Sequence, residues 1–105
     1  MRKKLPVIWA DEARKSLKEI YQYIKKDSPQ NAKKVRKELL RLAGSLNDFP
    51  EKYPREPFLD DEPENFRSVT KWSWKIIYEV TDSAIIILMI FHTSQNPDKI
   101  KRGIR

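Results

Sequence analysis

The chain has 105 residues, and its 22 Lys and Arg residues outnumber its 15 Asp and Glu residues, which gives a formal net charge of +7 at pH 7. This length suits one hydrophobic core, so we expect a single domain over residues 1–105. Cysteine is absent and histidine occurs once, which excludes disulfides and thiolate metal sites and argues against a zinc site built from protein ligands alone. We therefore expect no metal and no cofactor.

The apolar runs of the sequence are too short for a membrane helix. The longest, residues 84–91, is well under the roughly 20 residues that span a bilayer. The basic start at residues 2–4 is not followed by the apolar region of a signal peptide. We expect a soluble, cytoplasmic protein that makes no membrane contact.

Charge is spread unevenly along the chain. Residues 1–47 carry 13 basic and 5 acidic side chains, residues 48–65 carry 2 and 7, and residues 66–105 carry 7 and 3. A basic body is thus interrupted by one acidic segment. Such a surface attracts phosphate backbones or acidic proteins, and the alternative is a solvated, lysine-rich surface that only keeps the protein soluble.

The first half of the chain predicts a short strand and two helices. Residues 5–9 read as the strand, Asp11 is placed to cap the first helix, and Ser28 and Pro29 suit the N-cap and first position of the second. The apolar positions that share one face of the first helix are Ala13, Leu17, Ile20, Tyr21 and Ile24. Those of the second helix are Ala32, Val35, Leu39, Leu42 and Leu46. These stripes predict an antiparallel helical hairpin that lies on another layer.

The second half predicts an ordered loop and three strands. Residues 50–65 contain four prolines, which prevent a continuous helix or a central strand. Of the strand-like runs at residues 66–71, 74–80 and 84–93, the first two alternate, as half-buried strands do, and the third is apolar on both faces, as a central strand is. A tight turn at residues 81–83 makes the last two antiparallel. The expected fold is α+β in the order βααβββ, with the helical hairpin on one face of a small, twisted, mainly antiparallel sheet.

Two registers are open for the strands joined at residues 72–73. A two-residue turn would put Arg67 and Lys71 on the same face as Tyr78, and a three-residue turn would put them on the same face as Lys75. Because the Trp-Ser pair lacks the Asn-Gly or Asp-Gly chemistry of two-residue turns, the longer turn is favoured. It places the three cations together on the open face of the sheet.

The polar residues of that open face are the candidates for chemistry. Arginine or lysine can hold a scissile phosphate, and histidine transfers protons near neutral pH, which suits RNA cleavage by its own 2′-hydroxyl. The candidate catalytic residues are Arg67, Lys75 and His92, and Lys71 and Trp72 are candidates for target binding. The alternative is that these residues have structural roles. Lysines on exposed strands often prevent pairing with other chains, and a histidine at the sheet rim can donate a hydrogen bond to a backbone carbonyl. The acidic residues 59–66 match no calcium loop and read as a solvated loop.

Several segments recur in the order and spacing of a known family. They are "WADEARKSLKEIYQYIKKDSPQNA" opening the hairpin, "LAGSLNDFP" closing it, "FRSV" beginning the sheet, "KIIYEV" with its tyrosine, and "IFHTSQNP" ending the last strand. With these segments the chain resembles the RelE/ParE superfamily, the toxins of bacterial type II toxin–antitoxin pairs, also called plasmid stabilisation proteins. The resemblance implies growth arrest and a cognate antitoxin bound in a hetero-oligomer.

The resemblance implies one of two activities. RelE-like members cleave mRNA in the ribosomal A site with basic residues of the sheet and, in some, a histidine or tyrosine near the C-terminus. ParE-like members inhibit DNA gyrase and lack that catalytic set. The expected target is therefore either the ribosome with its mRNA or DNA gyrase.

The resemblance implies site residues at individual positions of this sequence. Arg67 and Lys71 match basic positions at the two ends of the first central strand, Lys75 matches the arginine of a "Y-R-I-x-Y" pattern, and His92 heads an ending that is commonly "H-x-R-R-x-P". Ser94 and Gln95 stand where that ending has arginines. They remain target-binding candidates, but they cannot replace the two-pronged donors of arginine.

The expected function is a growth-arresting toxin that cleaves mRNA without a metal if the catalytic candidates act together. The alternatives are a non-enzymatic gyrase inhibitor and a degenerate, inactive fold that only binds the antitoxin.

Overall fold

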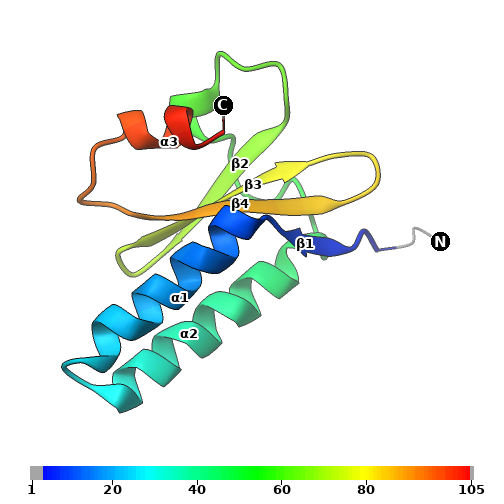
Figure 1. Cartoon of the computed structure of the whole chain (residues 1–105). Coiled ribbons are helices and arrows are strands. Elements are labelled where there is room, and N and C mark those ends of the chain that lie inside the picture. Colours follow the sequence, from blue (N-terminus) through cyan, green and yellow to red (C-terminus); the bar gives the residue numbers. More distant parts are fainter. Residues whose placement is uncertain (1–3, 105) are drawn as a thin grey trace.

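The computed structural model describes residues 4–104 and has a four-stranded sheet between helical layers (Figure 1). The elements are β1 (Val7–Trp9), α1 (Asp11–Lys25), α2 (Pro29–Gly44), the 3₁₀ turns η1 (Ser45–Asn47) and η2 (Pro57–Leu59), β2 (Phe66–Lys71), β3 (Trp74–Val80), β4 (Ile85–His92) and α3 (Asp98–Gly103). The strand order is β1-β4-β3-β2, in which β1 runs parallel to β4 and the other pairs are antiparallel. The predicted α+β fold is confirmed, and α3 follows it as an element that the sequence pattern did not predict.

The two long helices begin in different ways. Ser28 caps α2 as predicted, because its side-chain oxygen accepts a hydrogen bond from Asn31 N at 3.1 Å and Pro29 takes the first helical position. The prediction that Asp11 caps α1 is wrong: α1 begins at Asp11 itself, and Ala10 stands at the cap without a side-chain bond. The Asp11 carboxylate instead lies in the first turn, where it interacts favourably with the positive end of the helix dipole.

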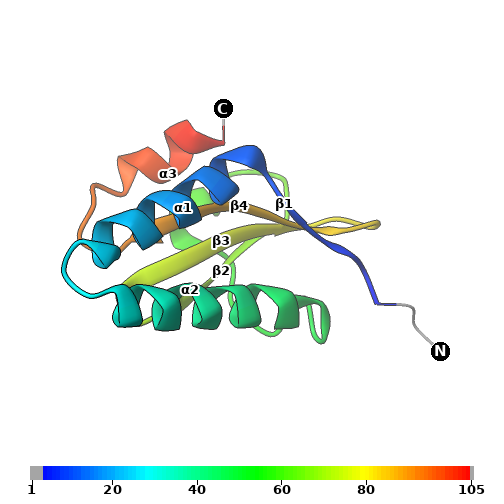
Figure 2. The same ribbon diagram turned by 60° about the horizontal axis from the view of Figure 1, so that its bottom comes forward.

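The helical hairpin covers one face of the sheet (Figures 1 and 2). Its apolar stripes join β3 and β4 in the main hydrophobic core. The completely buried members of this core are Ala13, Leu39, Ala43, Ile76, Tyr78, Ile85 and Ile87. All five apolar positions predicted for the inner face of α2 and η1 are buried, and of those predicted for α1 only Tyr21 and Ile24 are partly exposed.

A second, smaller core lies on the opposite face of the sheet, beneath α3 and η2. Ile100 of α3 and Leu59 of η2 are completely buried there. Their buried partners are Phe66, Ile77, Met89 and Phe91. This layer explains why β3 is buried on both faces from Ile76 to Tyr78, where a half-buried strand was expected: β3 lies between two strands and under a helical layer on each side.

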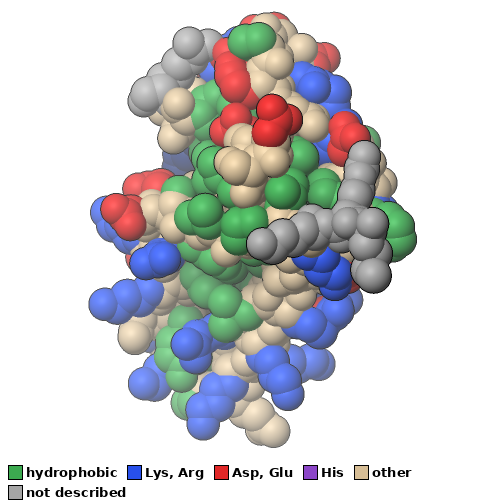
Figure 3. Space-filling model, turned by 90° about the vertical axis from the view of Figure 1, so that its right-hand side faces the viewer, with side chains coloured by type: hydrophobic (Ala, Val, Ile, Leu, Met, Phe, Trp, Pro, Cys, Tyr) green, Lys and Arg blue, Asp and Glu red, His purple; other side chains and the backbone are tan. Residues whose placement is uncertain are grey.

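Basic and acidic side chains lie mostly over different layers of the fold. Lys and Arg side chains gather over the lower half of the view in Figure 3, where the helical hairpin lies, and residues 11–44 carry ten basic and five acidic side chains. The acidic side chains in that view lie mostly in its upper half. None of the helices in the described part of the chain is long and apolar enough to cross a membrane.

Candidate functional site

The turn between β2 and β3 decides which candidate residues share a face. Lys71 pairs with Trp74 and Arg67 with Tyr78, so the turn has two residues. The favoured three-residue turn is therefore wrong, and the two-residue alternative is correct. Trp72 adopts the positive φ, 54°, that such turns need at their first position. Burial outweighs turn propensity here, because a slip of one residue would exchange the buried Phe66 with the charged Arg67.

This register separates the candidate catalytic residues. Arg67 lies on the face of Tyr78, beside the helical hairpin, whereas Lys75 pairs with Phe91 and lies on the face that α3 covers. His92 pairs with Trp74 at the far end of the sheet, on the hairpin side. The expectation that the basic side chains line one open face is wrong, since paired residues of adjacent strands point to the same side.

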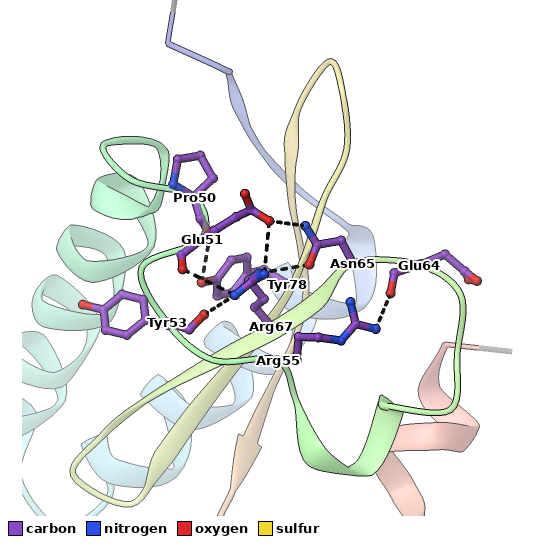
Figure 4. A network of polar contacts seen from close by, with 8 residues as sticks. All are labelled: Pro50, Glu51, Tyr53, Arg55, Glu64, Asn65, Arg67 and Tyr78. Atoms are coloured by element: carbon purple, nitrogen blue, oxygen red, sulfur yellow. Dashed lines mark hydrogen bonds and ion pairs between the residues drawn. The ribbon is translucent and has the colours of Figure 1, made fainter.

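The Arg67 side chain is hydrogen-bonded to the loop that precedes η2 (Figure 4). Its Nη1 donates to the Tyr53 carbonyl at 2.7 Å, its Nε donates to Asn65 Oδ1 at 2.9 Å, and its Nη2 lies 3.1 Å from Glu51 Oε2. The side chain is 15% exposed. All three guanidinium nitrogens thus have partners within the protein, and Arg67 fastens the loop to the start of β2.

Lys75 forms an ion pair with a buried carboxylate on the opposite face of the sheet. Its Nζ lies 2.8 Å from Glu56 Oε1, and the Lys75 and Glu56 side chains are 17% and 0% exposed. Glu56 Oε2 accepts a hydrogen bond from Phe58 N at 2.8 Å, which caps η2. The ammonium group also lies 5.5 Å from the centroid of the Phe58 ring. A phosphate could reach Lys75 only by displacing these contacts.

His92 ends β4 in a local turn rather than in an open catalytic arrangement. Its Nδ1 accepts a hydrogen bond from Ser94 N at 3.1 Å and lies 2.7 Å from Ser94 Oγ. A backbone N–H can only donate, so Nδ1 carries no proton and the ring proton is on Nε2. Gln95 Oε1 accepts from His92 N at 3.1 Å, and the imidazole packs edge-on against Trp74 with ring centroids 4.7 Å apart. Ser94 and Gln95 therefore shape the end of the strand.

The tip of the β2–β3 hairpin brings Lys71 and Trp72 together. The Lys71 ammonium lies 5.0 Å from the centroid of the Trp72 ring, and Trp72 is 50% exposed. Thr93 N donates to the Ser73 carbonyl at 2.9 Å, which ties the end of β4 to this tip. The four target-binding candidates thus lie at the same end of the sheet.

A groove of about 670 Å³ runs along the end of β4 between α1 and α3. Its apolar and aromatic lining comes from Ile20, Tyr23, Trp74, Met89, Ile90 and Phe91. Its polar rim combines Glu12, Ser16 and Glu19 of α1 with His92, Ser94, Gln95 and Lys99. Sequence reasoning did not single out the residues of α1 and α3 here, because they meet His92 only through the tertiary fold.

Four ionisable groups of the described chain have a pKa moved by their surroundings, and one of them is Arg41, whose pKa is raised by its hydrogen bond to Glu38. Burial raises the pKa of Tyr78 to about 12, although the charge of Arg67 opposes this. Burial, and then the charge of Glu64, raises the pKa of Glu79. A hydrogen bond from Arg41 lowers the pKa of Glu38 on α2, and the charge of Lys71 adds to that effect. The Tyr78 hydroxyl is therefore a poor proton acceptor or donor near neutral pH.

The acidic segment makes internal contacts. Leu59 and Phe66 at its two ends are buried in the second core, and Asp61 forms an ion pair with Lys101 of α3, so the expected solvated loop is anchored at several points. Within residues 4–104, no group of three or more His, Asp and Glu side chains is arranged to hold a metal ion. Glu56 and Glu51 were not singled out from the sequence, where the only signal was an acid directly before Pro57 at a capping position.

A comparison with models of protein families finds a match that spans the helical hairpin and all four strands. A model described as the ParE toxin of the type II toxin–antitoxin system parDE matches residues 7–97. The chain belongs to the ParE toxin family. The predicted toxin role and the resemblance to the RelE/ParE superfamily are thereby confirmed.

Relatives of known structure agree with this ParE fold. The chain is similar to a structure titled "Chromosomal ParDE TA system from P. aeruginosa", with a TM-score of 0.71 and 21% sequence identity over 87% of this chain and 98% of that chain. At this identity the likeness shows the shared fold. No curated protein matches the sequence.

Proposed function

We propose that this ParE-family protein arrests growth by binding DNA gyrase, without cleaving RNA, and that a cognate antitoxin neutralises it in the cytoplasm. The observation behind this choice is the separation of Arg67, Lys75 and His92. Two of these side chains are in ion pairs on opposite faces of the sheet, and the third uses its acceptor nitrogen locally. Family membership supports the gyrase alternative, which the superfamily resemblance assigns to ParE-like members.

The arrangement of His92 argues against proton transfer from RNA. A general base must lie within about 3 Å of the proton that it takes, and it needs a free acceptor nitrogen. In His92, Nδ1 already accepts the Ser94 N–H and Nε2 carries the proton, so Nδ1 can take a proton only by losing this hydrogen bond. Arg67 and Lys75 cannot compensate, because no single phosphate reaches both faces of the sheet.

The test compares the two targets directly. We expect the purified toxin to reduce supercoiling by purified gyrase and to leave a defined mRNA intact in a translation extract. Cleavage of that mRNA at codons would overturn the proposal, and its loss in an Arg67→Ala variant that is still folded would restore the nuclease interpretation. A folded toxin that inhibits neither system and does not harm growth would instead favour the inactive, antitoxin-binding fold.

His92→Asn is the matched control. Asparagine Oδ1 can accept the Ser94 N–H in place of Nδ1, but it performs no acid–base chemistry near neutral pH. We therefore expect His92→Asn to keep full inhibition of gyrase, whereas a histidine-dependent nuclease would lose its activity in the same variant.

A further inference from the structure

Trp72 occupies a backbone conformation that tryptophan disfavours. It stands first in the two-residue turn of the β2–β3 hairpin with φ of 54°, the left-handed region that glycine and asparagine adopt most readily. Among the non-glycine residues of the described chain, it is the one with a positive φ. Such strain persists when the surrounding structure enforces it, and it often marks a functional contact.

Burial does not explain why the indole is there. Trp72 is 50% exposed and belongs to neither hydrophobic core, whereas Trp74, two residues later, packs against the main core. Its ring contact is with the Lys71 ammonium, 5.0 Å from the ring centroid. The fold therefore places a large, partly exposed aromatic surface at the tip of a hairpin and gains little packing from it.

The surroundings of the tip are basic. Besides the hydrogen bond from Arg41, the charge of Lys71 lowers the pKa of Glu38, a residue on a partly exposed face of α2. Lys34 and Arg41 share that face at four residues before and three after Glu38, and Lys37 lies next to it. Glu38 is paired with Arg41, which leaves a surplus of positive charge from Lys34, Lys37 and Lys71.

We propose that this tip binds nucleic acid that exposes unpaired bases, with the Trp72 indole stacked on a base and Lys71 and Lys34 contacting phosphates. Aromatic rings flanked by cations bind single strands in this way, because every base has a face for stacking and a duplex hides it. An acidic protein partner would suit the charge, but it would not need an exposed indole. This inference goes beyond the proposed function, since it assigns a ligand to the tip whether or not gyrase is the target.

The experiment measures the fluorescence anisotropy of a labelled oligothymidylate and of a duplex of the same length, over about 50 to 200 mM salt. We expect tighter binding to the single strand. Trp72→Gly should weaken that binding about tenfold or more without changing its salt dependence, because stacking releases few counterions. Trp72→Phe should keep most of the affinity. Lys34→Gln should instead reduce the salt dependence, as the loss of one phosphate contact does.

Trp72→Gly also separates binding from folding. Glycine accepts the positive φ, so this variant should unfold at the same temperature as the unchanged protein or at a higher one. Unchanged single-strand affinity in Trp72→Gly, or preference for the duplex, would overturn the inference. Loss of gyrase inhibition with unchanged oligonucleotide binding would assign the tip to a protein partner and overturn it as well. Binding as expected by a protein that leaves gyrase unaffected would overturn only the proposed function.

Discussion

Lys75 Nζ lies 2.8 Å from Glu56 Oε1, and the Glu56 side chain is completely buried. Burying a carboxylate is unfavourable unless it is paired and hydrogen-bonded, and Glu56 is both, since its second oxygen accepts from Phe58 N. The pair joins the start of β3 to η2 on the face that α3 covers. It therefore gives Lys75 a structural role that does not depend on any target.

Replacing one partner of this pair should destabilise the fold strongly. We expect Glu56→Ala to lower the free energy of unfolding by about 3 kcal/mol, because it leaves the Lys75 ammonium buried without its partner and removes the cap of η2. The double variant Glu56→Leu/Lys75→Met should lose much less, since it replaces both charges with apolar groups. Urea denaturation of the single and double variants checks this, and equal losses in both would show that the pairing is not the cause.

Arg67 should likewise act through the loop that it holds. Arg67→Ala removes bonds to the Tyr53 carbonyl and to Asn65, and we expect it to lower the free energy of unfolding by about 2 kcal/mol and to speed proteolysis at residues 51–56. Arg67→Lys should recover only a part, because one ammonium cannot span the three acceptors. A variant Arg67→Ala that is as stable as the unchanged protein but inactive would place Arg67 in contact with the target instead.

Much of the fold could be predicted from the sequence because its signals are local. The stripes of the two helices, the Ser28-Pro29 start and the run of three strands depend on spacing and capping within a few residues. α3 escaped prediction because its single fully buried residue, Ile100, is buried only when Leu59 and Met89 meet it across the second core. A helix of six residues is less than two turns long, so its sequence is too short to show a helical repeat of apolar residues.

The candidate site was less predictable because it depends on one register. Turn chemistry favoured three residues at Trp72-Ser73, and burial of Phe66 imposed two, which moved Arg67 to the other face from Lys75. The departure at Ser94 and Gln95 was visible in the sequence. Its meaning became clear only with the hydrogen bonds that these two residues make to His92.

Glu79 should make the protein less stable as pH rises through the acid range. Burial, and then the charge of Glu64, raises its pKa above the ordinary value of 4.5, so the folded state holds this proton more tightly than the unfolded chain. Stability is therefore lost as pH rises from about 4 upward. We expect Glu79→Gln to be more stable by a few tenths of a kcal/mol at pH 7 and to show no gain near pH 3. Urea midpoints at the two pH values check this, and a variant that is less stable at pH 7 would contradict it.

Tyr78 should produce a loss of stability in the alkaline range. Burial raises its pKa from 10.0 to about 12, so the unfolded chain releases the phenolic proton first, and the free energy of unfolding falls as pH rises between these values. The fall should approach about 2 kcal/mol. Tyr78→Phe is the control, because the hydroxyl lies a long 3.5 Å from the Pro50 carbonyl and its removal costs little at neutral pH. The difference in stability between the two proteins, measured by urea denaturation from pH 8 upward, should shift in favour of Tyr78→Phe as the pH passes 10. A difference that stays constant would mean that water reaches the hydroxyl in the folded protein.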